Sequence, residues 1–157
     1  MNGNNLPNIE QAILAIAAAI ANKSGEGYRA GLFTTGTSTG NQAITGLPFK
    51  PRAVIFLTSL NAAVAAAANA GMGVGFADAD GNQQVVHFTV RNGHGGFSGV
   101  QGGCIYISTI NSGGGSAGVN VAASLLSIDD AGDGTYGFTI NKTTAAVSQS
   151  IAYLAME

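Results

Sequence analysis

Apolar and polar residues alternate with a period of two along most of the chain, as they do in β-strands that bury one face. A clear example is segment 83–92, whose two faces consist of Val86, Phe88 and Val90 and of Val85, His87, Thr89 and Arg91. Near the end of the chain, Tyr136, Phe138 and Ile140 alternate with Gly137, Thr139 and Asn141. These patterns predict strands with two distinct faces.

About nine such segments, separated by turns rich in Gly, Asn and Asp, predict a mainly β domain over residues 28–157, an antiparallel β-sandwich of the jelly-roll kind. Segments 28–35 and 41–45 flank the sequence GTSTG, which predicts a hairpin. The continuous apolar run Arg52–Leu60 predicts a strand covered on both faces. The Ala-rich segment Asn61–Gly71 fits either a short helix or a long loop over the sandwich.

The period changes near the N-terminus, where apolar residues recur in steps of three and four, as on one side of an α-helix. The residues of this Ile seam are Leu6, Ile9, Ile13, Ile16 and Ile20. They match the a and d positions of a heptad repeat, and Ile at both positions favours bundles of three or four helices. Segment 22–27 is a Gly-containing linker, which divides the chain into an N-terminal oligomerisation and anchor segment, 1–27, and the β domain, 28–157.

The Ile seam therefore predicts a homotrimer held by a short N-terminal α-helix. The flanking positions Ala12, Ala17 and Ala19 carry no charge, and a helix of this length is marginal alone. The rest of its surface therefore needs cover from the β domain or from a host structure. The alternative is an ordinary core helix that lies on the sheet within one subunit.

Charged residues are scarce, at 9% of the chain against about 25% in a typical soluble domain. A formal net charge of −2 and scattered Lys and Arg residues argue against nucleic acid as a partner and against a polybasic membrane-binding patch. The apolar run 12–21 is half of the roughly 20 residues that a membrane-spanning helix needs, so no membrane span is expected. The single cysteine, Cys104, excludes an intrachain disulfide and fits a reducing compartment or a virion assembled inside a cell.

No motif predicts catalysis, a metal or a cofactor. The sequence DADGN (78–82) places Asp78, Asp80 and Asn82 at calcium-loop spacing, and DDAGDG (129–134) supplies Asp129, Asp130 and Asp133. Both lack a closing carboxylate and are predicted to be hairpin turns. Cys104 heads an apolar strand, where a lone cysteine acts as a small hydrophobe. The sequence GFSGV (96–100) lacks the final glycine of a nucleophile elbow. We therefore expect a non-enzymatic protein without metal or cofactor.

The glycine-rich segment Arg91–Gly103 is predicted to be a loop that could bind a ligand. Its candidate ligand-binding residues are Arg91, Asn92, His94, Phe97 and Gln101. An aromatic ring offers a flat apolar surface to a sugar, and amide and imidazole groups offer directional hydrogen bonds. A solvated loop without a ligand is the alternative.

The sequences GLFTTGTSTGNQAITGLPFKPRAVIFLTS, GVGFADADGN, DDAGDGTYGFTIN and IAYLAM, spread over Gly31–Met156, resemble β-sandwich accessory virion proteins of tailed bacteriophages, of the head decoration, head spike or tail-fibre kind. The resemblance implies a homotrimer that contacts other virion proteins and is assembled in the host cytoplasm. Since the chain has no long shaft, a short head decoration or spike is expected. The alternative is a carbohydrate-binding receptor-recognition module, either a tail tip or a lectin, with a host surface glycan as its partner.

Overall fold

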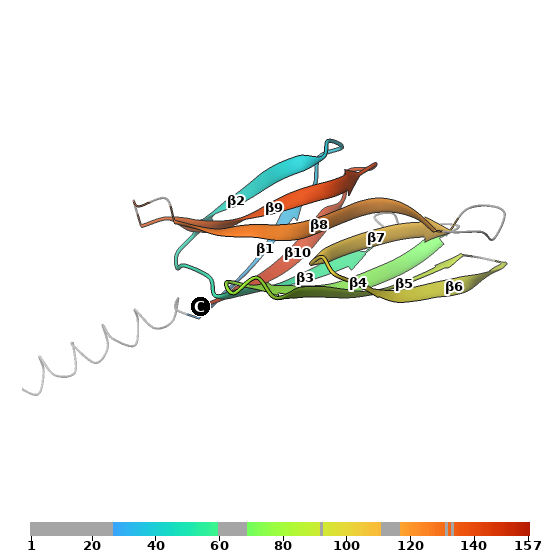
Figure 1. Ribbon diagram of the computed structural model, residues 1–157, viewed down its shortest axis with the longest axis horizontal. Coiled ribbons are helices and arrows are strands. Elements are labelled where there is room, and N and C mark those ends of the chain that lie inside the picture. The colour runs from blue at the N-terminus through green and yellow to red at the C-terminus, as the bar shows by residue number, and fades with distance from the viewer. Residues whose placement is uncertain (1–26, 60–68, 92, 111–116, 131, 133) are drawn as a thin grey trace, which may run out of the picture.

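The computed structural model describes residues 27–59, 69–91, 93–110, 117–130, 132 and 134–157, which form two antiparallel β-sheets (Figure 1). The prediction of a mainly β chain is confirmed, whereas the predicted N-terminal helix lies outside the described residues. The strands described are β1 (Tyr28–Thr34), β2 (Gly40–Leu47), β3 (Ala53–Ser59), β4 (Asn69–Asp78), β5 (Gln83–Arg91), β6 (His94–Gln101), β7 (Ile105–Ile110), β8 (Ala117–Asp130), β9 (Tyr136–Ala145) and β10 (Ser150–Met156).

The six-stranded sheet has the order β1-β10-β3-β4-β5-β6, and the four-stranded sheet, which lies over it in Figure 1, has the order β2-β9-β8-β7. The predicted hairpin between the first two strands is wrong, because β1 pairs with β10 and β2 pairs with β9. After β1 the chain is held by the loop before β10, where Thr35 donates its backbone N–H to the carbonyl of Gln149 at 2.8 Å and its Oγ1 accepts the Gln149 N–H at 3.0 Å. The chain then crosses to the other sheet.

The core lies between the two sheets and contains a cluster of aromatic rings. Phe138 of β9 is fully buried, and its ring centroid lies 5.7 Å from that of Phe56 in β3 and 5.3 Å from that of Tyr153 in β10, both edge to face. Phe33 of β1 packs edge to face on the same ring at 6.4 Å. Because these partners come from the six-stranded sheet, the packing of Phe138 stabilises the contact between the two sheets.

The side of β4 that faces the core carries only small residues, namely Gly71, Gly73, Gly75 and Ala77. At Gly75 and Gly73 the other sheet lies too close for a side chain. A Cβ at Gly75 would overlap the carbonyl oxygen of Cys104, just before β7, and one at Gly73 would lie 2.8 Å from Thr58 Oγ1 and 3.2 Å from the carbonyl oxygen of Tyr106 in β7. Consequently the large residues of this strand, Met72, Val74 and Phe76, point away from the core and are 41% to 46% exposed.

Candidate functional site

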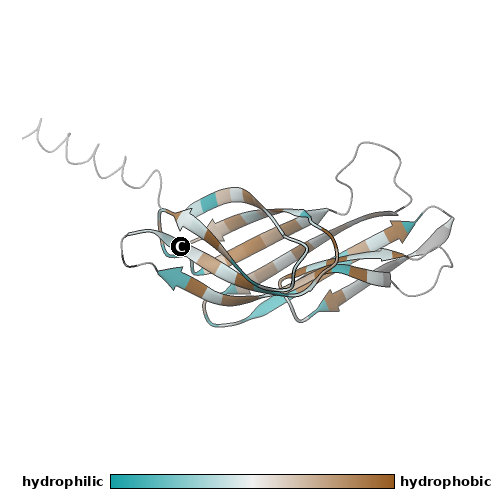
Figure 2. Cartoon of the chain, turned by 90° about the horizontal axis from the view of Figure 1, so that it is seen from above, coloured by the Kyte–Doolittle hydropathy of each residue, from teal (hydrophilic) through white to brown (hydrophobic). Residues whose placement is uncertain are grey.

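The face of the six-stranded sheet that points away from the four-stranded sheet is apolar, and we call it the outer face. The alternation predicted for β5 is confirmed, but its polar members face inward: His87 is 8% exposed and Thr89 is 2% exposed. The apolar members face outward, with Val86 at 56%, Phe88 at 44% and Val90 at 42%. Figure 2 shows apolar and polar residues alternating along the strands. Over residues 86–90 the usual arrangement, with apolar side chains inside, is thus inverted, whereas Val85 near the start of the strand is fully buried.

The outer face is continuous across the whole sheet. The strand registers place one residue from each of the six strands in a single apolar row, which runs Leu32, Ala152, Leu57, Val74, Val86, Val100. The large apolar side chains exposed over β3 to β6 are Leu57, Met72, Val74, Phe76, Val86, Phe88, Val90 and Val100. A contiguous exposed surface of this kind is typical of an association site rather than of a solvated surface.

The described strands place almost no charge on this face. Asp78, at the end of β4, is the only acidic residue there, and the registers of these strands place no Lys or Arg on it. The Asp78 carboxylate accepts hydrogen bonds from the Asn82 side chain at 2.9 Å and from the backbone N–H groups of Asn82 at 2.9 Å and Asp80 at 3.0 Å, and these bonds lower its pKa. DADGN is therefore a turn between β4 and β5, as predicted.

A shallow hollow interrupts the outer face between β4 and β5. Its volume is about 200 Å³, and it lies among Met72, Val74, Val86 and Phe88, with Ser98 of β6 at its rim. The walls are almost wholly apolar, so the hollow can receive an apolar side chain but offers little to a polar ligand.

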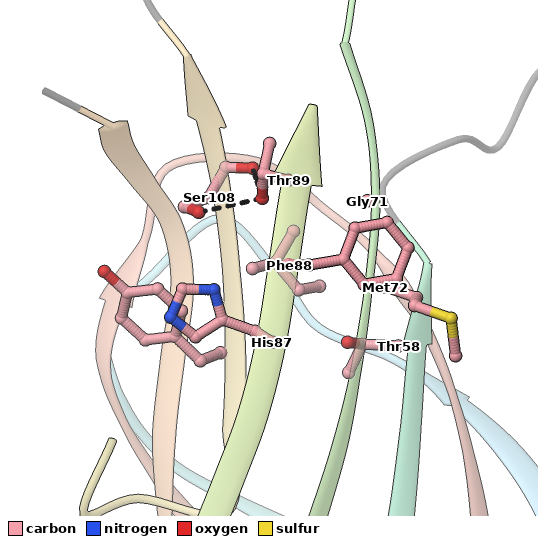
Figure 3. A pocket seen from close by; sticks show the side chains of 9 residues that line it. Thr58, Gly71, Met72, His87, Phe88, Thr89 and Ser108 are labelled. Carbon is pink, nitrogen blue, oxygen red and sulfur yellow. Dashed lines mark hydrogen bonds between the residues drawn. The ribbon is translucent and has the colours of Figure 1, made fainter. Parts of the chain in front are cut away.

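On the inner side of the same strands, His87 faces a polar space between the two sheets. Figure 3 shows Met72 and Phe88 on one side of the sheet and His87, Thr89 and Ser108 on the other. Thr89 Oγ1 lies 3.1 Å from both the carbonyl oxygen and the Oγ of Ser108. The space among these residues holds about 10 Å³, the size of one water molecule, which is too small for a substrate.

The imidazole of His87 is held by packing. Its ring centroid lies 4.3 Å from that of Tyr106 in β7, at an angle of 35°, and neither ring nitrogen has a hydrogen-bond partner among the described residues. Burial lowers the pKa of His87, because the charged ring would lose its hydration. The neutral form is therefore favoured in the folded protein.

Cys104, the single cysteine of the chain, is fully buried. Burial raises the pKa of its thiol to about 12, and the thiol donates a weak hydrogen bond to the carbonyl of Ala123 at 3.6 Å. A thiol with this pKa is protonated at neutral pH and cannot act as a nucleophile. The residue is part of the core, as its apolar sequence context predicts. Among the described residues, no three His, Cys, Asp or Glu side chains gather as metal ligands would.

The predicted ligand-binding loop Arg91–Gly103 is mostly a strand, so that prediction is corrected. Segment 94–101 pairs with β5, and it is the strand that the sequence pattern missed. Its glycines obscure the apolar–polar alternation, yet they are useful in the strand: Gly99 lies opposite His87, and a Cβ there would lie 3.2 Å from the imidazole Nε2.

Four of the five candidate ligand-binding residues lie on this strand pair, and Gln101 is at the opposite end from the other three. Arg91 ends β5 and donates to the carbonyl of Ile110 at 2.8 Å. In the β5–β6 register, His94 lies opposite Arg91 and Phe97 opposite Thr89, whereas Gln101 lies at the far end of β6. Asn92 is outside the described residues.

Two other predictions concern residues that the structure does not describe. The Ile seam, formed by Leu6, Ile9, Ile13, Ile16 and Ile20, lies wholly outside the described residues. Of segment Asn61–Gly71, residues 69–71 begin β4 and the others are not described.

The outer face itself was not predicted, although two sequence features point to it. The run Arg52–Leu60 is apolar at successive positions, which predicts cover on both sides of β3, and segment 83–92 carries its larger apolar residues on a single face. Both features fit a sheet whose second face becomes buried in an assembly.

Comparisons do not identify relatives of this chain. No protein-family model matches it, and neither does any curated protein or solved structure. Within the described residues, no helix is long and apolar enough to cross a membrane.

Proposed function

We propose that this chain is a non-enzymatic structural protein of a tailed-phage virion, a short homotrimeric head decoration or spike built on a jelly-roll-like β-sandwich and anchored by its N-terminal segment. The observation that carries the proposal is the outer face, a large apolar surface almost without charge on the six-stranded sheet. Such a surface supports function by association. The resemblance over Gly31–Met156 supports the virion context.

The chemistry of the described residues supports the same proposal. Cys104 is a buried thiol, His87 faces a space the size of one water molecule, and Asp78 is engaged in a turn. An enzyme needs groups of this kind to converge on a space that admits a substrate. The proposed mechanism is therefore adhesion and reinforcement of a particle, without turnover.

Light scattering after gel filtration tests the proposed trimer on the full chain. We expect the mass of a trimer at micromolar concentration, and we expect Ile13→Asp to lower it by placing a charge in the Ile seam. Gln11→Asp is the matched control, because position 11 lies outside the Ile seam of the predicted helix. A wild-type monomer at micromolar concentration would contradict the proposal.

Imaging of particles that carry the chain tests the proposed location. We expect density at discrete head sites, and we expect deletion of residues 1–27 to abolish occupancy because the deletion removes the proposed anchor. Unchanged occupancy of the truncated chain would place the attachment on the β domain instead. Absence of the full chain from every particle would contradict a virion role.

A carbohydrate-binding module is the second candidate, and one hollow favours it. The hollow has a volume of about 180 Å³ and lies where β6 leads into β7, and its lining includes Gln101, Tyr106, Ser124 and Thr143. These residues combine an aromatic ring with an amide and two hydroxyl groups, and a sugar ring requires such a mixture of apolar contact and hydrogen bonds. A glycan array tests this candidate: specific binding that Gln101→Ala weakens would support it, and an array without signal would exclude the glycans displayed.

A further inference from the structure

We propose that the outer face is a contact between copies of this chain, in which the outer faces of the copies pack together inside the oligomer. This inference rests on the self-association in the proposed function and adds a contact within the β domain, separate from the Ile seam. Its partner is therefore a second copy of the same chain.

The first argument is area. Six strands about 4.8 Å apart, over the seven residues of β3 at about 3.3 Å each, span about 650 Å². The largest apolar patch of a typical monomer covers about 300–600 Å², and a stable protein interface buries about 800 Å² on each partner. The whole outer face, its polar positions included, is thus close to the size that one side of a stable interface requires.

The second argument is that the chain's own N-terminal segment is too small to cover this face. A helix over the Ile seam, from Leu6 to Ile20, would be about 22 Å long and about 10 Å wide. Its footprint of about 220 Å² is about one third of the outer face. Most of the apolar row from Leu32 to Val100 would still face water, whereas a second sheet would cover all of it.

The third argument is charge. A face that meets its own copy brings identical groups together, so any net charge on it would repel. Apart from Asp78 in its turn at one end, the described strands place no acidic residue, Lys or Arg on the outer face. Phe and Met, which are enriched at protein interfaces, occupy its centre as Met72, Phe76 and Phe88.

The test measures how fast a thiol reagent labels a cysteine placed on the outer face of the full-length protein. Val86→Cys lies in the middle of the apolar row, and Leu126→Cys on β8 of the other sheet is the matched control, because Val86 and Leu126 are both 56% exposed in the single chain. The native Cys104 is fully buried and gives a low background. Circular dichroism confirms that both variants fold.

The expected result is that the introduced thiol of Val86→Cys reacts at least tenfold more slowly than that of Leu126→Cys in the oligomer, and that this protection disappears on dilution to the monomer. A trimer in which both introduced thiols react equally fast would overturn the inference and leave the proposed trimer intact. Protection of Val86→Cys in an oligomer of another size would support the inference and contradict the trimer.

Two further outcomes count against the inference. Protection of Val86→Cys that persists in the monomer, identified by light scattering at the same dilution, would mean that another part of the same chain covers the face. A monomer in which the two variants are labelled equally fast would overturn both the inference and the proposed trimer. As a second variant, Val86→Lys should lower the oligomer mass or raise its dissociation constant at least tenfold, with Leu126→Lys as its control, and unchanged association of Val86→Lys would also overturn the inference.

Discussion

The substitution Gly75→Ala should destabilise the protein strongly, although it adds a single methyl group. In a strand without backbone strain, replacing Gly with Ala stabilises by about 0.4–1 kcal/mol, because it reduces the freedom of the unfolded chain. Here the added Cβ would overlap the carbonyl oxygen of Cys104, which directly precedes β7, and this backbone atom cannot rotate away. The two sheets would have to separate locally by on the order of 1 Å, and a gap of that size forfeits a quarter to a half of the dispersion energy of each contact.

We expect Gly75→Ala to lower the free energy of unfolding by about 3 kcal/mol, at the upper end of the cost of overpacking a core. Urea unfolding at a fixed protein concentration measures the change. Gly102→Ala is the control, because a Cβ there meets no atom within 4 Å and Gly102 does not need a left-handed backbone, so we expect its stability to be unchanged or slightly raised. A loss of less than about 1 kcal/mol for Gly75→Ala would refute the explanation that β7 forces the inward side of β4 to be small.

Three further predictions address the core, its histidine and the acidic turns. Phe138→Ala should lower the free energy of unfolding, measured in urea, by about 4–5 kcal/mol, since it removes a fully buried ring with three edge-to-face contacts. Phe138→Leu should lower it by about half as much. Equal losses for the two variants would contradict the role of the ring contacts. Because burial lowers the pKa of His87 below its value of about 6.5 in the unfolded chain, the unfolded chain binds more protons just below pH 6.5. The contribution of neutral His87 to the free energy of unfolding should therefore be fully present above about pH 6.5, and it should fall by up to about 1.4 kcal/mol per pH unit as the pH decreases towards the pKa of the folded protein. The variant His87→Leu should lack this pH dependence. Identical pH profiles of the free energy of unfolding for the two proteins would disprove the prediction. EDTA should leave the thermal midpoint unchanged, because the Asp78 carboxylate serves the β4–β5 turn, and a drop of more than a few degrees would reveal a structural metal.

The alternation in segment 83–92 predicted a strand and the membership of each face, but it could not say which face would be buried. On hydropathy alone, Val86, Phe88 and Val90 would lie inside. The opposite occurs because β7 lies so close to β4 that the core side there admits only small residues, and because His87 stacks on Tyr106 across the sheets. That choice depends on the second sheet, which local sequence does not describe.

Strand pairing shows the same dependence on distant parts of the chain. The segments that became β1 and β2 were predicted as strands, and both exist, but GTSTG does not join them into a hairpin. The partner of Tyr28 is Met156, at the other end of the domain. For segment 94–101, glycines conceal the strand pattern, and its pairing with β5 becomes visible only in the folded sheet. The association that the Ile seam predicts stays a prediction, because the seam lies outside the described residues.

The position of β10 determines when this domain can finish folding. β10 is the last strand in the sequence, but it lies between β1 and β3 in the six-stranded sheet, where its partners run from Tyr28–Thr34 on one side to Ala53–Thr58 on the other. Contacts between such distant segments form slowly, and ribosomal synthesis delivers this strand last. Until then β1 and β3 have unpaired backbone N–H and C=O groups, with which strands of other chains can pair. The nascent domain is therefore most prone to aggregation just before synthesis of β10 is complete.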